Sequence, residues 1–339
     1  MQALIEFASF ALKLLLLTIA VILVISLIAR LIATARGGRR TLVIPYRNAV
    51  ARASDPLRRA AWRPAQFKAH AKKRRAEQKA AANKPKPRVW VLEFDGDPRA
   101  SNVPTLKDEI TAVLNVAQDD DEVMIRVNSS GGTVVGYGLA ATHLDRIRRA
   151  NLRLTAAVDE AAASGGYLMA SVANEIIAAP FSVVGSIGVI ATIPNAHKLL
   201  EEKGIEILEF TAGEHKRTVT PFSEVTEERR RKLLEQLSDI HILFKDFVSV
   251  RRPNLSIDEV ATGEYWFGTR ALELGLIDRL MTSDEWMLEK METHDVYLIR
   301  TLTPGAKLLT HADRLARALG SRLQRFSSAD DDTLNIPKF

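Results

Sequence analysis

Between residues 88 and 251 the chain alternates short apolar runs with longer segments whose apolar side chains recur every three to four residues. The short runs, rich in Val, Ile and aromatic residues, predict buried strands, and the longer periodic segments predict amphipathic helices. We expect strands at 88–94, 122–127, 152–158, 175–179 and 205–210, and helices at 106–117, 133–149, 165–173 and 226–251. Strands that alternate with helices predict an α/β domain with a parallel sheet, built from right-handed crossovers and covered by helices.

The first apolar run, residues 7–29, is of a different kind. It holds 23 residues with one charge, Lys13, and is long enough to cross a bilayer core of about 30 Å. A cleaved signal peptide is the alternative, since Ala33-Thr34-Ala35 resembles a cleavage site. Such a peptide has basic residues before a shorter apolar run, whereas here Glu6 precedes the run and Arg30 follows it. We therefore expect an uncleaved transmembrane anchor over residues 1–33.

The net charge of +6 is concentrated directly after this run. Residues 30–88 hold 18 Lys or Arg against two acids, a local charge of +16, which leaves −10 for the rest of the chain. We expect a basic stalk and linker over residues 34–87, ending in the stiff Lys84-Pro85-Lys86-Pro87. The stalk is either solvated or lies on anionic lipid headgroups. Nucleic acid is not expected as a partner, because the stretch adjoins a span and has few aromatic residues.

Two glycine-rich turns fall where predicted strands give way to helices, the edge at which open α/β sheets bind ligands. The first is Asn128-Ser129-Ser130-Gly131-Gly132, whose amides can approach a substrate oxyanion. The second is Ser164-Gly165-Gly166, and on spacing alone Ser164 is a helix N-cap. Its alternative role is that of a nucleophile. Lys216, 52 residues further on, is the general base of that hypothesis if it is held neutral and a solvated lysine if it is not.

Other chemistries have less support. The chain has no cysteine, and its His, Asp and Glu residues show no metal-ligand spacing, so we predict neither a metal nor a cofactor. Among seven histidines only His215 lies beside a candidate residue, and it is the alternative base. The apolar stretch 180–194 is too short to span a bilayer, and a span there would separate Ser164 from Lys216. We expect it to be a buried strand and loop at the site.

Five stretches together resemble the signal peptide peptidase A family of membrane-associated serine peptidases, and most closely its SohB branch. They occur in the family's order between residues 88 and 295: Asn128-Ser-Ser-Gly-Gly-Thr-Val134, Ala162-Ala-Ser-Gly-Gly-Tyr-Leu168, Val184-Gly-Ser-Ile-Gly-Val189, Thr211-Ala-Gly-Glu-His-Lys-Arg217 and Gly263…Ala271-Leu-Glu-Leu-Gly-Leu-Ile-Asp278. The resemblance implies the ClpP/crotonase-like α/β/α spiral for residues 88–300.

The resemblance also assigns roles to single residues. Ser164 matches the nucleophile, Lys216 the general base, and Ser186 a serine that orients this lysine. Gly131 and Gly165 match the two amides of the oxyanion hole. The family usually has a proline where this chain has Ser130, a change that is expected to loosen the first turn.

The function that the resemblance implies is that of an inner-membrane serine endopeptidase. Its partners are extended peptides, such as signal-peptide remnants or misfolded membrane-associated polypeptides, the lipid bilayer and further copies of the chain in a closed ring. A crotonase-like acyl-CoA enzyme and a non-catalytic membrane scaffold are the alternatives.

Two points about the ends of the chain stay open. The arginines after residue 29 favour a cytoplasmic catalytic domain, whereas the resemblance favours the periplasm. Residues 301–339 predict an amphipathic basic helix and a tail, packed on protein or lying on the membrane surface.

Overall fold

The computed structural model describes residues 40–81, 86–213 and 216–302. Val43–Arg300 form one compact unit, and the second unit, Met1–Leu42 with Thr301–Phe339, lies almost entirely outside the described residues. The predicted span at 7–29 and nearly all of the predicted C-terminal helix are therefore not described. Within the three described ranges, no helix is both long and apolar enough to cross a bilayer.

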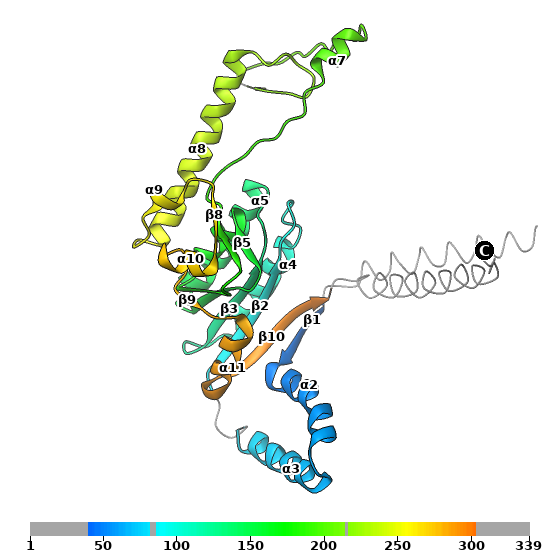
Figure 1. Ribbon diagram of the computed structural model, residues 1–339, viewed down its shortest axis with the longest axis vertical. Coiled ribbons are helices and arrows are strands. Elements are labelled where there is room, and N and C mark those ends of the chain that lie inside the picture. Colours follow the sequence, from blue (N-terminus) through cyan, green and yellow to red (C-terminus); the bar gives the residue numbers. More distant parts are fainter. Residues whose placement is uncertain (1–39, 82–85, 214–215, 303–339) are drawn as a thin grey trace, which may run out of the picture. The chain divides into compact units, whose positions relative to one another are not determined.

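A seven-stranded sheet forms the centre of the compact unit (Figure 1). Its strands lie in the order β1-β10-β2-β3-β4-β6-β9, and β10, β2, β3, β4, β6 and β9 pair in parallel. Their bounds are Arg40–Pro45 for β1, Asp295–Leu302 for β10, Arg88–Asp95 for β2, Glu122–Asn128 for β3, Arg153–Val158 for β4, Glu175–Ala178 for β6 and Arg279–Leu280 for β9. The α/β class with a parallel sheet, predicted from the alternating pattern, is confirmed.

Three further strands make a small second sheet in the order β5-β7-β8. Their bounds are Ala161–Ala163 for β5, Val183–Gly185 for β7 and Tyr265–Phe267 for β8. β5 and β7 pair in parallel, and β7 pairs with β8 in the antiparallel sense. The expectation for residues 180–194 holds in part, because β7 supplies a strand with Val184 fully buried. This small sheet carries the chain into the second glycine turn.

Both faces of the central strands are buried, which explains why they read as continuous apolar runs. On β2, Trp90, Leu92 and Phe94 pack into the larger core, together with α4, Val103–Val116, and α5, Val134–Arg149. Val89 and Val91 face the other way and pack in a smaller core with Trp286 of α11, Ser283–Thr293. The side chains alternate between the two faces because successive residues of a strand point in opposite directions.

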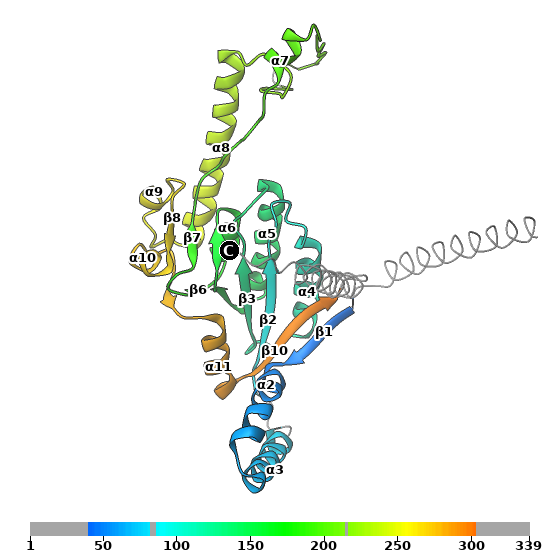
Figure 2. The same ribbon diagram turned by 45° about the vertical axis from the view of Figure 1, so that its right-hand side comes forward.

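The remaining helices differ in length and surroundings. The long α8, Glu227–Arg251, begins at Thr226, whose hydroxyl accepts a hydrogen bond from the Arg229 amide, as expected for an N-cap. α8 leads away from the sheet toward α7 in both views (Figures 1 and 2). The shorter helices are α6 at Gly165–Ala170, α7 at His197–Glu202, α9 at Ile257–Val260 and α10 at Gly268–Glu273.

The strand expected at residues 205–210 is not formed, so this prediction is wrong. The segment has no regular secondary structure, and its apolar side chains are exposed, with Phe210 91% accessible. A strand needs a neighbour to receive its backbone hydrogen bonds, and an alternating sequence alone does not supply one.

The basic region contains two helices between β1 and β2, α2 at Tyr46–Ala61 and α3 at Pro64–Ala81. Pro56 falls inside α2, and the turn at Trp62 and Arg63 separates the two helices.

Candidate active site

Ser164 stands at the junction of β5 and α6 in a strained conformation. Its backbone has φ 50° and ψ −118°, a region that L-residues adopt at a cost of about 1–3 kcal/mol. The Ser164 amide donates to Gly185 O at 2.8 Å, and its carbonyl accepts from Leu168 N at 2.9 Å, so both ends of the residue are held. The side chain makes no capping hydrogen bond to the helix. Capping, the alternative role considered for this serine, is therefore not what its hydroxyl does.

The structure brings Ser164 together with the first glycine turn. Ser129 forms a parallel bridge with Ala162: Ser129 N donates to Ala161 O at 2.8 Å, and Ala163 N donates to Ser129 O at 3.0 Å. Gly131 follows with φ +94°, and a Cβ placed on it would come within 2.8 Å of Gly165 N and of Ser164 Cβ. Three of the five predicted site residues, Gly131, Ser164 and Gly165, thus lie in direct contact.

A buried chain of hydrogen bonds supports this contact. Gly131 N donates to Ser129 Oγ at 3.1 Å, Ser129 Oγ is 2.5 Å from the Tyr137 hydroxyl, and that hydroxyl donates to Asp97 O at 2.9 Å. Burial raises the pKa of Tyr137, so the phenol keeps the proton that it donates. An oxyanion at Gly131 would have to replace Ser129 Oγ as the acceptor of this amide.

The Tyr137 ring also lies directly behind the second turn. A Cβ on Gly165 would be 2.4 Å from Tyr137 Cγ, so only glycine fits there. Neither the role of Ser129 nor that of Tyr137 in supporting the site could be predicted from the sequence. The one available signal was a polar residue placed directly after a buried strand.

A pocket of about 360 Å³ opens beside Ser164, and most of its lining is apolar. α5 contributes Val134 and Tyr137, and the loop after β7 contributes Val189 and Ile190. The far wall comes from one face of α8, at Ile240, Leu243, Phe244 and Phe247. Their i, i+3, i+4, i+7 spacing predicted the helix but not the pocket that it lines.

Ser186 lies one residue beyond the carbonyl that anchors Ser164. It too has a positive φ, 52°, and its amide donates to Glu264 O at 2.6 Å. Its hydroxyl donates to Gly263 O at 3.3 Å. The residue is close to the site, and its side chain is bonded to backbone.

Lys216 is not brought to Ser164 within one chain. It is exposed and lines a different pocket, with Thr218, Thr220 and Gln236 among its neighbours. Gln236 lies eight residues before Phe244 on α8, about 12 Å of helix rise from the Ser164 pocket. His215, the alternative base, lies outside the described residues.

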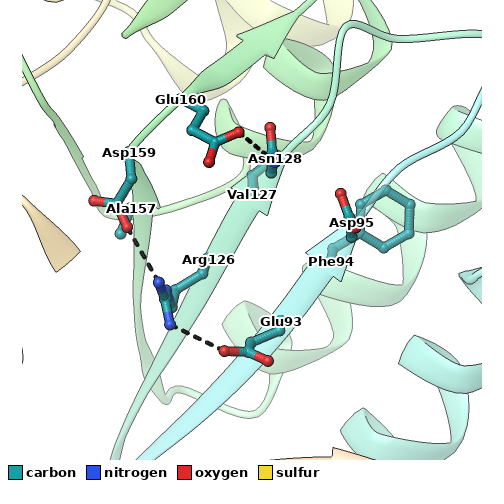
Figure 3. Close-up of a pocket in the computed structure, with 9 residues that line it drawn as sticks. All are labelled: Glu93, Phe94, Asp95, Arg126, Val127, Asn128, Ala157, Asp159 and Glu160. Carbon is teal, nitrogen blue, oxygen red and sulfur yellow. Dashed lines mark hydrogen bonds and ion pairs between the residues drawn. The ribbon is translucent and has the colours of Figure 1, made fainter. Parts of the chain in front are cut away.

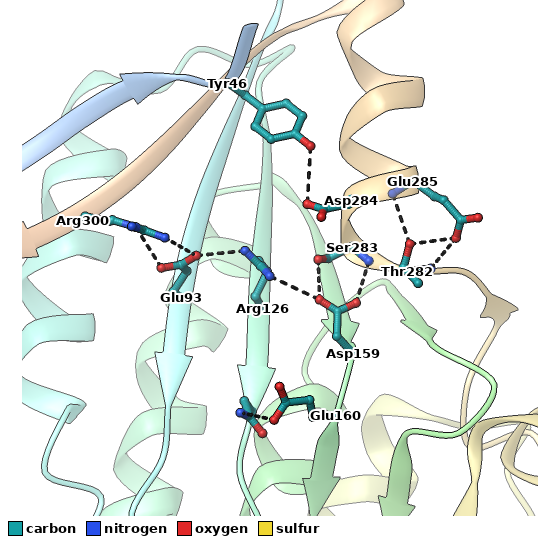
Figure 4. A network of polar contacts seen from close by, with 11 residues as sticks. Tyr46, Glu93, Arg126, Asp159, Glu160, Thr282, Ser283, Asp284, Glu285 and Arg300 are labelled. Atoms are coloured by element: carbon teal, nitrogen blue, oxygen red, sulfur yellow. Dashed lines mark hydrogen bonds and ion pairs between the residues drawn. The ribbon is translucent and has the colours of Figure 1, made fainter. Parts of the chain in front are cut away.

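A second, charged pocket of about 190 Å³ lies over the carboxyl ends of β2, β3 and β4 (Figure 3). Arg126 is its centre: the guanidinium bonds Glu93 Oε1 at 2.9 Å and Asp159 Oδ2 at 3.4 Å. The network continues to Arg300 through Glu93 and to Ser283 of α11 through Asp159 (Figure 4). The network therefore links β10 to β2 and β3 by ion pairs and fastens α11 to the end of β4.

No metal centre is evident in the part of the chain that the structure describes, where no three His, Cys, Asp or Glu side chains converge.

Comparison with known proteins places the chain in a protein family. Residues 146–297 match the model of peptidase family S49, and residues 2–144 match the model of the peptidase family S49 N-terminal region. The chain therefore belongs to peptidase family S49.

Within the family, the chain falls in the SohB branch. It is 52% identical over 208 residues to "Probable protease SohB" of Buchnera aphidicola subsp. Schlechtendalia chinensis, covering 61% of this chain and 68% of that protein. It is 50% identical over 212 residues to "Probable protease SohB" of Haemophilus influenzae, covering 62% of this chain and 60% of that protein. Among solved structures, a mutant of a membrane-bound stomatin-specific protease aligns with TM-score 0.41 at 13% identity, over 60% of this chain and 84% of that one.

Proposed function

We propose that the chain is a membrane-anchored serine endopeptidase in which Ser164 and Lys216 form a Ser-Lys dyad. The observation that carries the proposal is the state of Ser164: a strained backbone, a hydroxyl that caps nothing, and a contact with Gly131 at the edge of an apolar pocket. Strain of this kind is retained where the surrounding structure over-determines it, as at active sites.

In the proposed reaction, Ser164 Oγ attacks the scissile carbonyl carbon while its proton passes to Lys216 Nζ. The negative charge that develops on the carbonyl oxygen is stabilised by the Gly131 and Gly165 amides, the former released from Ser129 Oγ. The protonated lysine then gives its proton to the leaving amine, and an acyl-enzyme remains. Water attacks this ester with the lysine again as base, which returns the Ser164 hydroxyl and releases the acid product.

The position of Lys216 favours a dyad that is completed between copies of the chain. Lys216 is exposed and belongs to another pocket in its own chain. A closed ring of identical subunits repeats one contact, so a lysine that reaches the next subunit's Ser164 would complete every site. Ser186 directly follows Gly185, whose carbonyl accepts the hydrogen bond from the Ser164 amide. In this arrangement the Ser186 hydroxyl would orient the incoming lysine.

The substrates that fit are extended apolar peptides, such as signal-peptide remnants or misfolded membrane-associated segments. The pocket beside Ser164 is walled by aliphatic and aromatic side chains, which favours an apolar residue next to the cleaved bond. The predicted span at 7–29 would hold this site at the inner membrane. Residues 88–300 are then the peptidase domain, and residues 34–87 form the basic segment before it, of which β1 joins the central sheet.

Labelling with a fluorophosphonate probe tests the nucleophile, because such probes phosphonylate activated serines with loss of fluoride. The full-length chain in detergent should be labelled, and Ser164→Ala should abolish both the labelling and the hydrolysis of an apolar peptide. Ser101→Ala, which alters an exposed serine outside the pocket, is the matched control and should keep both. Labelling that persists in Ser164→Ala would show that the reactive serine lies elsewhere.

A further inference from the structure

The helices α2 and α3 form the most basic part of the chain, and the proposed chemistry gives them no role. Residues 46–81 hold eleven Lys or Arg against Asp55 and Glu77, a net charge of +9. Because the whole chain carries +6, the remainder is −3. A concentration of positive charge on one part of the chain favours association with an anionic partner.

Asp55 does not neutralise this surface. Asp55 is shared by Arg58 at 3.1 Å and Arg74 at 2.9 Å, and the contact with Arg74 joins the two helices. Arg52, Arg59 and Arg63 are exposed on α2 and the turn that follows it. Like charges this close repel one another, so an anionic partner would be bound favourably.

Apolar side chains are exposed among these cations. Leu57 is 70% accessible and Trp62 is 39% accessible, near the end of α2. The Arg58 guanidinium lies 5.8 Å from the Trp62 ring centroid, and the His70 ring meets Trp62 edge-on at 5.2 Å. Exposed Leu and Trp surrounded by arginine are typical of elements that lie in the headgroup region of a bilayer.

The base of α2 is fixed to the peptidase unit. The Tyr46 hydroxyl donates to Asp284 of α11 at 3.4 Å (Figure 4), and Arg47 donates to Met291 O at 3.4 Å. The basic surface is therefore attached to the folded unit at its first residues.

We infer that α2 and α3 form a docking surface for the headgroups of anionic phospholipids, with Leu57 and Trp62 entering the interface. The predicted span ends 17 residues before Tyr46, a reach of at most about 60 Å of extended chain. The surface thus lies within range of the same membrane. Nucleic acid fits less well, because a duplex would leave the exposed Leu57 without an apolar partner and a single strand stacks its bases on several free aromatic faces. Tyr46 is bonded to Asp284, and Phe67 has Arg59 over its ring at 5.1 Å, which leaves Trp62.

The absence of cysteine gives a direct test. Leu57→Cys creates a single thiol in the full-length chain, and an environment-sensitive dye on it reports insertion. The labelled chain is placed in nanodiscs of phosphatidylcholine alone or with about 30% phosphatidylglycerol. We expect at least a roughly twofold decrease in quenching by aqueous acrylamide in the anionic discs, reversed by about 0.5 M NaCl. A dye on Ala112→Cys, on the exposed face of α4, should not respond.

Substitution of selected charges tests which surface of the chain contacts the lipid. The triple variant Arg52→Gln, Arg59→Gln, Arg63→Gln should lose the response of the label, because each cation contributes about fivefold to attraction by an anionic surface. Removing the same charge elsewhere, with Lys107→Gln, Arg149→Gln and Arg153→Gln, should leave it intact. Equal quenching in both discs would overturn the inference. So would protection of the label by a short RNA duplex in detergent without protection by the anionic lipid.

The readout needs no peptidase activity, so the same measurements in a Ser164→Ala background separate a failure of docking from a failure of the proposed chemistry. A chain that does not enter the discs at all would refute the anchor. Vesicles of the two compositions, added to that chain, would then test the surface by itself.

Discussion

At the scale of single residues, the site depends on places where no side chain fits. Gly131 has a positive φ and faces Gly165 N and Ser164 Cβ, while Gly165 faces the Tyr137 ring. The chain can bring two turns and a serine into contact only because two of the residues at the contact lack a Cβ. These positions were recognisable from the sequence as glycines in turns, but the atoms that they approach were not.

Gly131→Ala should therefore harm both folding and catalysis. The new Cβ would lie 2.8 Å from Gly165 N, and residue 131 would keep a positive φ that alanine avoids. We therefore expect a loss of about 1–3 kcal/mol of stability. Displacing the Gly131 amide should lower kcat by about 100-fold or more. Thermal melting and peptide hydrolysis measure the two effects. Gly138→Ala is the stability control, because its Cβ meets nothing within 4 Å and a helical alanine should raise the melting temperature. A Gly131→Ala chain that is as stable and active as the parent would refute the close contact.

At the scale of elements, one carboxylate holds the first residues of β2 against the loop that leads into β3. Asp121, just before β3, has a side chain only 1% exposed. It accepts hydrogen bonds from Arg88 N at 2.8 Å, Gln118 N at 3.0 Å and Trp90 Nε1 at 3.1 Å. Burial alone would raise the pKa of Asp121, but these hydrogen bonds to the charged form outweigh it, and the pKa lies below its ordinary value.

A lowered pKa in the folded state means that ionised Asp121 stabilises the fold above the unfolded pKa of about 3.9 and ceases to do so as the pH falls through the folded pKa. Asp121→Asn should thus lower the melting temperature most at pH 7. The difference in melting temperature between Asp121→Asn and the parent should become smaller as the pH drops below about 4. Asp119→Asn, at an exposed neighbour, should show little gap at any pH. A gap for Asp121→Asn that stays constant from pH 7 to pH 3 would contradict the argument.

At the scale of the whole molecule, the separation of Lys216 from Ser164 means that the proposed dyad would have to form between subunits. If each dyad takes its serine and lysine from different subunits, inactive Ser164→Ala and Lys216→Ala chains should restore one another when they are co-assembled. With random closed rings at equal amounts, about one quarter of the sites would receive both residues. The expected result is about a quarter of parental hydrolysis from the mixture and almost none from either chain alone.

Two outcomes would contradict a dyad shared between subunits. One is a mixture as inactive as its parts although mixed oligomers are present. The other is full activity of a strictly monomeric chain. A matched mixture of Ser164→Ala with the double variant Ser164→Ala, Lys216→Ala should stay inactive in either case.

Much of the core could be predicted because it depends on neighbours in the sequence. The runs that became β2, β3, β4 and β6 are apolar throughout, since both of their faces are buried. α8 could be identified from its periodicity and its Thr226 cap. Gly131, Ser164 and Gly165 could be chosen because each follows a strand in a turn, the place at which α/β sheets carry their sites.

What only the tertiary structure decided depends on partners far away in the chain. Residues 205–210 have the composition of a strand but no strand to pair with, whereas β10 joins β2 across about 200 residues of sequence. The Ser129–Tyr137 chain of hydrogen bonds arises because a strand end and a helix meet. The same holds for Lys216, which the family resemblance paired with Ser164 while the fold of one chain leaves it in another pocket. Local side-chain patterns fix which segments are helix, strand or turn, but long-range packing decides which of their side chains meet.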